Sequence, residues 1–282
     1  METLVYQQTD RLMNVVVFFS GGASSLRGML SDPNFKQLYQ VVATFTDRKD
    51  ARGVNLAQQA GIPVLHLNRR EFYARGNLDP RSWESRKFYY ARVGEMLKEF
   101  NPDLICLSGY MHIVTDPLLG DFRYRMLNVH PADLAIATGP SVDRLYLGNL
   151  KTTDAIALVK EKQLQKKLKG ENAVFDALVA GEIYTKSTVH FATEDFDEGP
   201  IFVQSKRFDV DQALVAASLE STGEALTHYA NELQERMKEQ GDVPAYLKAL
   251  ELISTNQVRV RDGGTVLVDS NELPYKGFQL EY

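Results

Sequence analysis

The chain has 282 residues, of which 44% are hydrophobic and 24% are charged, and its formal net charge at pH 7 is -5. This length and composition predict a globular protein with one large α/β domain, or one domain with an appendage. No excess of positive charge is available to neutralise phosphates, so we expect no general binding to nucleic acid or to a membrane surface.

The single cysteine, Cys106, leaves no partner for an intrachain disulfide and no cysteine cluster for zinc, which favours a reducing compartment. The N-terminal residues have no long apolar core, and no segment approaches eighteen uncharged apolar residues. We therefore expect neither a signal peptide nor a membrane span, and the cytoplasm is the expected location.

In the first half of the chain, short apolar runs alternate with segments that have helical spacing of apolar residues. Strands are predicted at 14–19, 41–46, 63–67, 103–108 and 125–129, and helices at 25–30, 51–60 and 82–100. This alternation is typical of parallel strands joined by crossover helices. We therefore expect a Rossmann-like α/β fold, with a mostly parallel twisted sheet and helices on both faces.

The second half is predicted to add strands that follow one another directly. "STVHFATE" and "IFVQSKRF" are short, rich in β-branched and aromatic residues, and separated by the turn-forming "DFDEGP". A long helix is predicted from about 211 to 238. The tail "VRVRDGGTVLVD" predicts a C-terminal hairpin, because Asp262, Gly263 and Gly264 divide two alternating runs. The whole chain, 1–282, is expected to form a single domain.

A lysine-rich segment at about 139–172 is expected to be an insertion into this domain. Its core, "KTTDAIALVKEKQLQKKLKG", has the apolar spacing of an amphipathic helix that ends at Gly170. Two interpretations stay open: a solvated helix that covers a cleft, or a site for a phosphorylated or acidic ligand.

A turn rich in glycine and serine follows the first apolar run, in "VVVFFSGGASSLRGML". Unpaired backbone N–H groups at a helix start, helped by the hydroxyl groups of Ser24 and Ser25, can bind an anion. The pattern is neither the dinucleotide GxGxxG nor a Walker loop. A tight turn capped by serine explains the spacing equally well.

Asn128, His130 and Asp197 form the second group of chemical interest. Asn128 and His130 are two residues apart, so on an extended strand both side chains lie on the same face. That arrangement suits a hydrogen-bond donor to an oxyanion together with an acid or base. Asp197 lies in a turn with Gly199 and Pro200, and a carboxylate near an imidazole can orient it and raise its basicity. The simpler alternative is that His130 only packs at the end of a strand.

Five motifs occur in an order that resembles the folate-dependent formyltransferases. They are "SGGASSLRGML", "PDLICLSGYMHIVT", "LNVHPADL", "STVHFATEDFDEGPIFVQSK" and "LPYKGF". The resemblance runs from about residue 14 to residue 278, apart from the inserted segment. It implies the formyltransferase fold and transfer of a formyl group from 10-formyltetrahydrofolate to an amine. The glycine- and serine-rich loop and "LPYKGF" point to the branch that formylates glycinamide ribonucleotide in purine synthesis.

The resemblance also implies roles for individual residues. The catalytic residues of the family match Asn128, His130 and Asp197. The residues that bind the substrate match Ala23, Ser24, Ser25, Arg86 and Glu224. The segment against which the pterin of the folate lies matches Met111, His112, Ile113 and Val114. His112 replaces the arginine that is usual at its position, and a contact made mainly by the backbone tolerates that change.

The implied chemistry is direct transfer between small molecules and needs no metal. The amine attacks the formyl carbon, Asn128 and His130 stabilise the developing oxyanion, and Asp197 maintains the protonation state of His130 and accepts the amine proton, directly or through a water.

The identity of the acceptor is the least determined part of the implied function. After His130 the sequence "PADLAIATGPSVDRLYLGN" departs from the family pattern. Two alternatives to glycinamide ribonucleotide formylation therefore stay open: another amine acceptor, such as an amino sugar nucleotide or a methionyl-tRNA, or a non-catalytic folate-binding protein. Methionyl-tRNA is disfavoured, because those enzymes carry a separate basic C-terminal domain.

Overall fold

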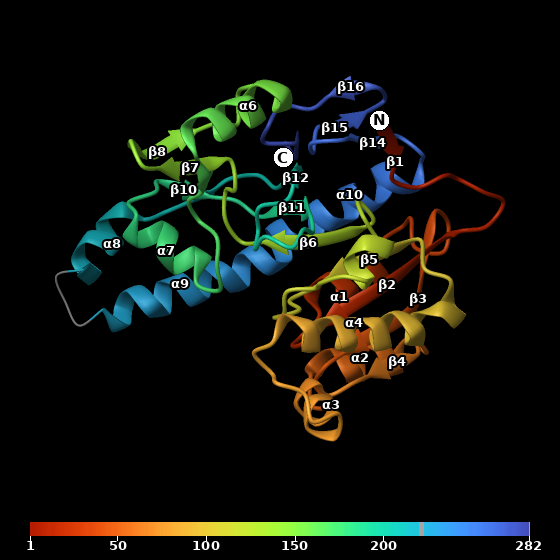
Figure 1. Ribbon diagram of the computed structural model, residues 1–282. Helices are drawn as coiled ribbons and strands as arrows, with labels where there is room; N and C mark the ends of the chain where they lie inside the picture. The colour runs from red at the N-terminus through yellow and green to blue at the C-terminus, as the bar shows by residue number, and fades with distance from the viewer. Residues whose placement is uncertain (220–222, 282) are drawn as a thin grey trace.

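The computed structural model describes residues 1–219 and 223–281, and an eight-stranded sheet forms its centre (Figure 1). The strand order is β17-β12-β11-β6-β5-β2-β3-β4. Five consecutive strands of this order are parallel to one another and coincide with the five predicted strands: β2 (Met13–Phe19), β3 (Tyr39–Thr46), β4 (Val64–His66), β5 (Leu104–Leu107) and β6 (Met126–His130). The expected mostly parallel α/β fold is confirmed.

An antiparallel edge completes the sheet beside β6. β11 (Thr188–Phe191) pairs antiparallel with β6 and with β12 (Ile201–Gln204), and β17 (Phe278–Gln279) runs parallel to β12. The predicted strand pair around "DFDEGP" is thereby confirmed. Because β11 is paired with β6, His190 lies directly opposite Asn128.

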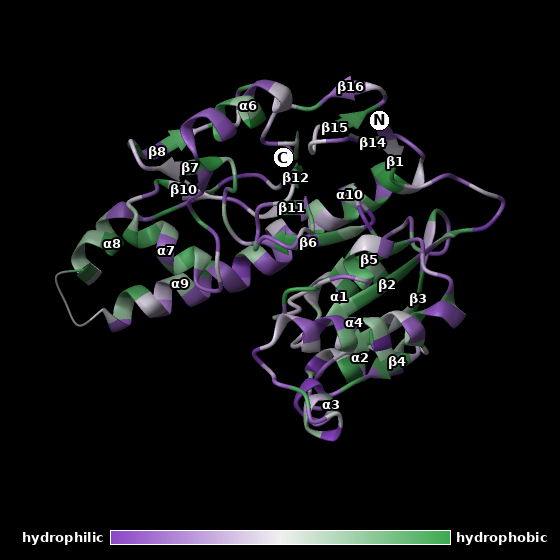
Figure 2. Cartoon of the chain, in the orientation of Figure 1, coloured by the Kyte–Doolittle hydropathy of each residue, from purple (hydrophilic) through white to green (hydrophobic). Residues whose placement is uncertain are grey.

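Helices cover both faces of the sheet, which explains why β2 is a continuous apolar run rather than an alternating one. Val15, Val17 and Phe19 contribute to one core cluster, and Val16 and Phe18 contribute to the other. Figure 2 shows the central strands mainly in the hydrophobic colour. The first cluster includes residues of α1 (Ser24–Leu30), α2 (Arg52–Gln59) and α10 (Val243–Ser254). The second includes residues of α3 (Arg69–Arg75), α4 (Trp83–Leu97) and α5 (Leu118–Asp121).

Helix α10 is tied to the two strands that carry the functional residues. The hydroxyl group of Tyr246 lies 2.8 Å from the carbonyl oxygen of Leu107 and 2.9 Å from that of Leu127, and all of Tyr246 is buried. One hydroxyl proton is shared between two acceptors, at the last residue of β5 and at the second residue of β6. This contact fixes β6 next to Asn128.

The C-terminal residues form a separate antiparallel sheet that includes the predicted hairpin. β14 and β15 pair across the turn at Asp262–Gly264, which confirms that prediction. The N-terminal strand adds to the same sheet beside β14 (Figure 1). The strands of this sheet are β1 (Glu2–Leu4), β14 (Val258–Arg261), β15 (Val266–Val268) and β16 (Asn271–Glu272).

The single helix predicted from 211 to 238 is wrong. The structure has α8 (Gln212–Leu219) and α9 (Glu224–Met237) instead, followed by the π-helical turn η2 (Lys238–Asp242). Residues 220–222 of the predicted helix lie outside the described residues. Gly223, directly before α9, has a φ of 75°, which an α-helix does not accommodate.

The lysine-rich segment is only partly helical, so the prediction of a helix that reaches Gly170 is wrong. α6 ends at Lys162, because Gln163 adopts a left-handed conformation with a φ of 51°. The chain then pairs with β7 and enters the interior. The elements of this region are β7 (Ile136–Gly139), β8 (Val142–Tyr146), α6 (Thr152–Lys162), β9 (Gln165–Lys166) and α7 (Ala173–Val179).

The remaining short elements, outside this region, are η1 (Lys98–Phe100), β10 (Tyr184–Thr185) and β13 (Phe208–Asp209).

Candidate active site

Asn128, His130 and Asp197 come together at the C-terminal end of β6. The Nδ2 atom of Asn128 lies 3.4 Å from Oδ1 of Asp197, and Nδ1 of His130 lies 3.2 Å from its Oδ2. His130 and Asp197 are both buried, with exposures of 4% and 5%. The two-residue spacing on β6 therefore directs both side chains at one carboxylate, as the sequence predicts; their catalytic role stays a prediction.

His190 is a fourth member of this cluster. Its Nε2 atom lies 3.2 Å from Nδ2 of Asn128 and 3.4 Å from Oδ1 of Asp197, and its Nδ1 atom lies 3.1 Å from the carbonyl oxygen of Phe191. The position of His190 on β11, directly opposite Asn128, produces these contacts. The sequence indicates only a strand residue here; its place in the cluster depends on the pairing of β6 with β11.

The carboxyl group of Asp197 is held in its charged form. Burial alone raises its pKa, but the hydrogen bond with His190, the charges of His130 and His190, and the backbone amide of Gly170 outweigh burial and lower the pKa to about 2. Nδ1 of His130 therefore faces a permanent negative charge. Burial lowers the pKa of His130, and the Asp197 charge and the Leu168 carbonyl oppose that shift.

The inserted segment forms one wall of this cluster, which the sequence does not indicate. Residues 164–170, here called the strap, run from β9 across the Asp197 turn. Nε2 of His130 lies 2.7 Å from the carbonyl oxygen of Leu168, and the amide of Gly170 donates to Oδ2 of Asp197 at 3.2 Å. Because a carbonyl oxygen only accepts, Nε2 carries a proton in this arrangement.

The glycine- and serine-rich loop that contains Ser24 and Ser25, here called the serine loop, borders the same cluster. Ser24 and Ser25 line a cavity of about 170 Å³ together with Asn128, His130 and Asp197. Ala23 is buried beside them in a left-handed conformation with a φ of 52°, and the amide of Ser25 donates to Oγ of Ser108. The Oγ atom of Ser25 is buried and has no hydrogen-bond partner among the described residues.

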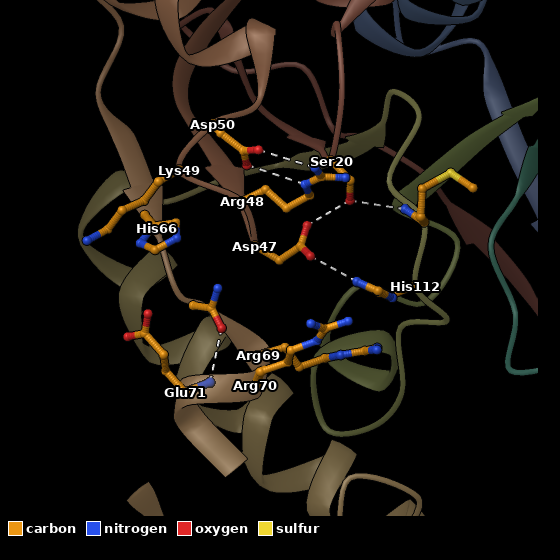
Figure 3. Close-up of a pocket in the computed structure, with 12 residues that line it drawn as sticks. Ser20, Asp47, Arg48, Lys49, Asp50, His66, Arg69, Arg70, Glu71 and His112 are labelled. Atoms are coloured by element: carbon orange, nitrogen blue, oxygen red, sulfur yellow. Dashed lines mark hydrogen bonds and ion pairs between the residues drawn. The ribbon is translucent and has the colours of Figure 1, made fainter. Parts of the chain in front are cut away.

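The predicted folate segment lies on the other side of Asn128. His112, Ile113 and Val114 line a cavity of about 50 Å³ with Asn128, His190 and Asp197, whereas Met111 lines the cavity that contains the serine loop. The side chain of His112 points away, into a neighbouring cleft of about 650 Å³ (Figure 3). There its Nε2 atom lies 2.9 Å from Oδ2 of Asp47, whose Oδ1 accepts from Ser20.

Two predicted substrate-binding residues do not join the cluster. Arg86 lies on α4 with its guanidinium group over the ring of Trp83, 5.4 Å from the ring centroid, and it does not line either cavity next to Asn128. Glu224 is exposed in the first turn of α9, at the end of that helix far from β6 (Figure 1).

The expectation for Glu224 is therefore not supported by its position. Ten residues of helix separate it from Gln234, which is about 15 Å at the rise of an α-helix. The residues that this part of the chain contributes to the cavity beside Ser25 are Gln234, Lys238 and Asp242. The sequence carries no signal that distinguishes these three from the other polar residues of the region.

Asp242 is a buried carboxyl group in the π-helical turn. Burial raises its pKa to about 6, a shift that the nearby hydroxyl group of Ser187 and the charge of Lys238 oppose, and its Oδ1 atom has no hydrogen-bond partner among the described residues. π-Helical turns are often found at functional sites, and so are strongly perturbed carboxyl groups that border a cavity.

Asp242→Asn is expected to stabilise the protein at neutral pH. The folded-state pKa is raised, so the native carboxyl group destabilises the fold progressively as the pH rises from about 4 to about 6. The free energy of unfolding of the variant minus that of the wild type is expected to be roughly 3 kcal/mol larger at pH 8 than at pH 4. Thermal unfolding at both pH values measures it, with the exposed Glu239→Gln as control. An advantage that does not depend on pH would contradict the prediction.

The described part of the chain lacks two further features, a metal-binding cluster and a membrane-spanning helix. Within residues 1–219 and 223–281, no group of three or more His, Cys, Asp or Glu side chains is arranged to hold a metal ion. Over the same residues, no helix is both long and apolar enough to cross a membrane.

Comparison with known proteins agrees with this geometry. Residues 13–140 match the formyl transferase family model. The chain is similar to formyl transferases. The matched region contains the serine loop, residues 111–114, Asn128 and His130, whereas Asp197 and the strap lie outside it.

Relatives of this chain include a purine biosynthetic protein and a formyltransferase. The chain is 27% identical over 253 residues to the trifunctional purine biosynthetic protein adenosine-3 of Bos taurus, with 89% of this chain covered. It spans only 19% of that protein, about a fifth of its length. The phosphoribosylglycinamide formyltransferase of Escherichia coli (strain K12) is 26% identical over 195 residues, which cover 69% of this chain and 72% of that enzyme.

A solved formyl transferase structure shares the fold. The phosphoribosylglycinamide formyltransferase of Coxiella burnetii superposes with a TM-score of 0.67 at 22% identity and covers 96% of this chain and all of its own. At this identity the likeness establishes the fold alone, and the acceptor must be inferred from the site.

Proposed function

We propose that this protein transfers the formyl group of 10-formyltetrahydrofolate to the amine of glycinamide ribonucleotide. The observation that carries the proposal is the convergence of Asn128, His130 and Asp197 at one cavity that also contains Ser24 and Ser25. An amide donor, an imidazole and an ionised carboxylate at one buried point are the groups that acyl transfer to an amine requires.

In the proposed reaction the neutral amine attacks the formyl carbon, and the carbonyl oxygen becomes an oxyanion. Asn128 Nδ2 and His130 donate hydrogen bonds to that oxyanion, which stabilises the tetrahedral intermediate. Asp197, which is ionised at rest because its pKa is about 2, accepts the proton of the attacking amine directly or through a water. That proton passes to the nitrogen of tetrahydrofolate as its bond to the formyl carbon breaks, the oxyanion becomes the carbonyl of the new formamide, and Asp197 is ionised again.

His130 must change its hydrogen bond to take part in this reaction. In the structure its two ring nitrogens face Leu168 and Asp197, so neither is directed at a substrate. The two cavities beside Asn128 measure about 170 and 50 Å³. Sites for small organic ligands usually measure about 300 to 1,000 Å³. We therefore infer that the His130 ring and the carbonyl group of Leu168 separate when the substrates bind, while Lys166 stays on the Asp197 turn.

The acceptor is proposed to bind at the serine loop. Ser25 Oγ and Asp242 Oδ1 are both buried and without partners among the described residues, so they can pair with groups of a ligand. Lys238 borders the same cavity and supplies a positive charge. A phosphate near the serine loop and a hydroxyl-bearing sugar near Asp242 fit this arrangement, and the formyl donor would approach from the side of residues 111–114.

We extend the proposal to a single-domain cytoplasmic enzyme that acts on small molecules and needs no metal. One core cluster supports a single domain, because it contains residues from both ends of the chain, including Val5 and Val266. The net charge of -5 supports small-molecule substrates over nucleic acid.

The deciding experiment follows tetrahydrofolate formation by absorbance with purified protein, 10-formyltetrahydrofolate and glycinamide ribonucleotide. Turnover that depends on the acceptor supports the proposal. An amino sugar nucleotide in place of glycinamide ribonucleotide tests the alternative acceptor. Formation of tetrahydrofolate without any acceptor would identify water as the acceptor and contradict formyl transfer to an amine. Folate binding without turnover on any acceptor would support a non-catalytic folate-binding protein.

A further inference from the structure

Lys166 is a buried cation in the strap, and its position is unusual for a residue of a lysine-rich segment. Its exposure is 3%, and its Nζ atom donates to the carbonyl oxygens of Asp197 at 2.8 Å and Gly199 at 2.5 Å. Its backbone amide donates to Oε1 of Glu198 at 3.2 Å. One lysine therefore contacts all three residues of the turn that carries the carboxylate of the active-site cluster.

The Asp197 turn needs external support because of its backbone conformation. Asp197 has a φ of 55°, in the left-handed region that residues other than glycine rarely adopt. Such conformations persist where the surrounding structure holds them. On the other side, Gly199 packs so closely on the backbone of Phe191 that a Cβ atom there would lie 1.7 Å from its carbonyl oxygen. The ammonium group of Lys166 holds the turn from the side that faces the strap.

The charge of Lys166 also reaches the histidine. Burial lowers the pKa of Lys166 to about 8, and the charges of Glu198 and Asp197 oppose this shift while that of Lys169 adds to it. The charged groups that act on His130 are Asp197, which raises its pKa, and His190 and Lys166, which lower it. Loss of the Lys166 charge alone would therefore raise the pKa of His130, whereas displacement of the Asp197 carboxylate would lower it.

We propose that Lys166 is a positioning residue for Asp197: its ammonium group binds the carbonyl oxygens of Asp197 and Gly199 and so directs the carboxylate toward His130 and His190. The insertion is then part of the active site and not a solvated cover. The kinetic part of this inference rests on the proposed formyl transfer, but the structural part does not.

The test compares Lys166→Met, which keeps the length of the side chain, with Lys166→Arg, which keeps the charge. Lys167→Met is the matched control, because the neighbouring lysine pairs with the exposed Asp143 and not with the Asp197 turn among the described residues. The first readout is an NMR titration of the histidine rings without substrate, with the His130 signal assigned from its absence in His130→Ala. The second readout is kcat and KM for formyl transfer.

Lys166→Met is expected to lower the pKa of His130, because the displaced Asp197 carboxylate raises it more than the Lys166 charge lowers it. The variant is also expected to lower kcat by roughly a hundredfold with little change in KM, since a small misplacement of a catalytic group has effects of this size. A raised pKa of His130 would mean that only the charge was lost and would contradict a positioning role. Lys166→Arg is expected to restore the wild-type titration and part of kcat, and Lys167→Met to change neither. If the Met variant does not fold, Lys166→Gln, which keeps one donor and loses the charge, gives the same comparison.

A folded Met or Gln variant with wild-type His130 titration and wild-type kcat overturns the inference. Lower thermal stability with an unchanged His130 titration also overturns it, because Lys166 would then act only in folding. If the wild type shows no formyl transfer, the proposed function fails, and the titration alone still decides whether Lys166 positions the cluster.

Discussion

His130→Ala is expected to lower kcat for formyl transfer by roughly a hundredfold to ten-thousandfold, the range that general acid–base catalysis contributes. The side chain is buried at the end of β6, and its Nδ1 atom lies 3.2 Å from an ionised Asp197. No other described residue presents an imidazole to both the carboxylate and the cavity of Ser24 and Ser25. The measurement is steady-state kcat and KM with glycinamide ribonucleotide as acceptor.

The control for His130→Ala is His228→Ala. His228 is exposed on α9 and contacts Glu232 one turn away, so its loss is expected to leave kcat unchanged. His130→Gln tests whether side-chain volume matters, because glutamine fills much of the same space without titrating. Wild-type kcat in a folded His130→Ala variant would show that this histidine only packs at the end of its strand.

Asp197→Asn is expected to lower kcat by about ten-thousandfold, as in the serine-protease triad when the carboxylate partner of the catalytic imidazole becomes neutral. The change preserves the shape of the side chain and removes the charge between His130 and His190. The matched control is Asp195→Asn, two residues earlier in the same turn and exposed. A small effect on kcat would mean that neither histidine depends on the carboxylate.

Asp197→Asn also has an expected effect on stability. The folded-state pKa of Asp197 is lowered to about 2, so its charge stabilises the fold above pH 4, and that contribution is lost as the pH falls from about 4 to 2. The variant is expected to be less stable than the wild type by roughly 2 kcal/mol at pH 7 and by less at pH 3. Urea unfolding at the two pH values measures the difference, and a constant difference would contradict the assignment.

Much of the fold could be predicted because its signals are local. An apolar run such as residues 14–19 is buried on both faces of a parallel sheet, and that burial leaves a continuous pattern in the sequence. The two-residue spacing of Asn128 and His130 on a strand likewise predicts that both side chains share a face, and the structure directs both at Asp197. These conclusions depend only on the two-residue alternation of side chains along a strand.

The strap could not be predicted, because its pattern fits two structures. Leu164 and Leu168 are four residues apart, which suits one face of a helix and equally one face of a strand that also includes residue 166. In the helix Lys166 would be a solvated residue; in the strand it shares the buried face with both leucines. The left-handed conformation of Gln163 ends the helix, and the pairing of β9 with β7 makes the following residues extended.

The sequence by itself therefore determined the parallel sheet, the serine loop and the three polar residues at the ends of their segments, since each depends on neighbours in the chain. Only the tertiary structure decided that His190 faces Asn128, that Asp242 rather than Glu224 borders the cavity, and that Lys166 binds the Asp197 turn. Each of these contacts joins segments dozens of residues apart. Their geometry is set by strand pairing and helix packing, and no local pattern encodes it.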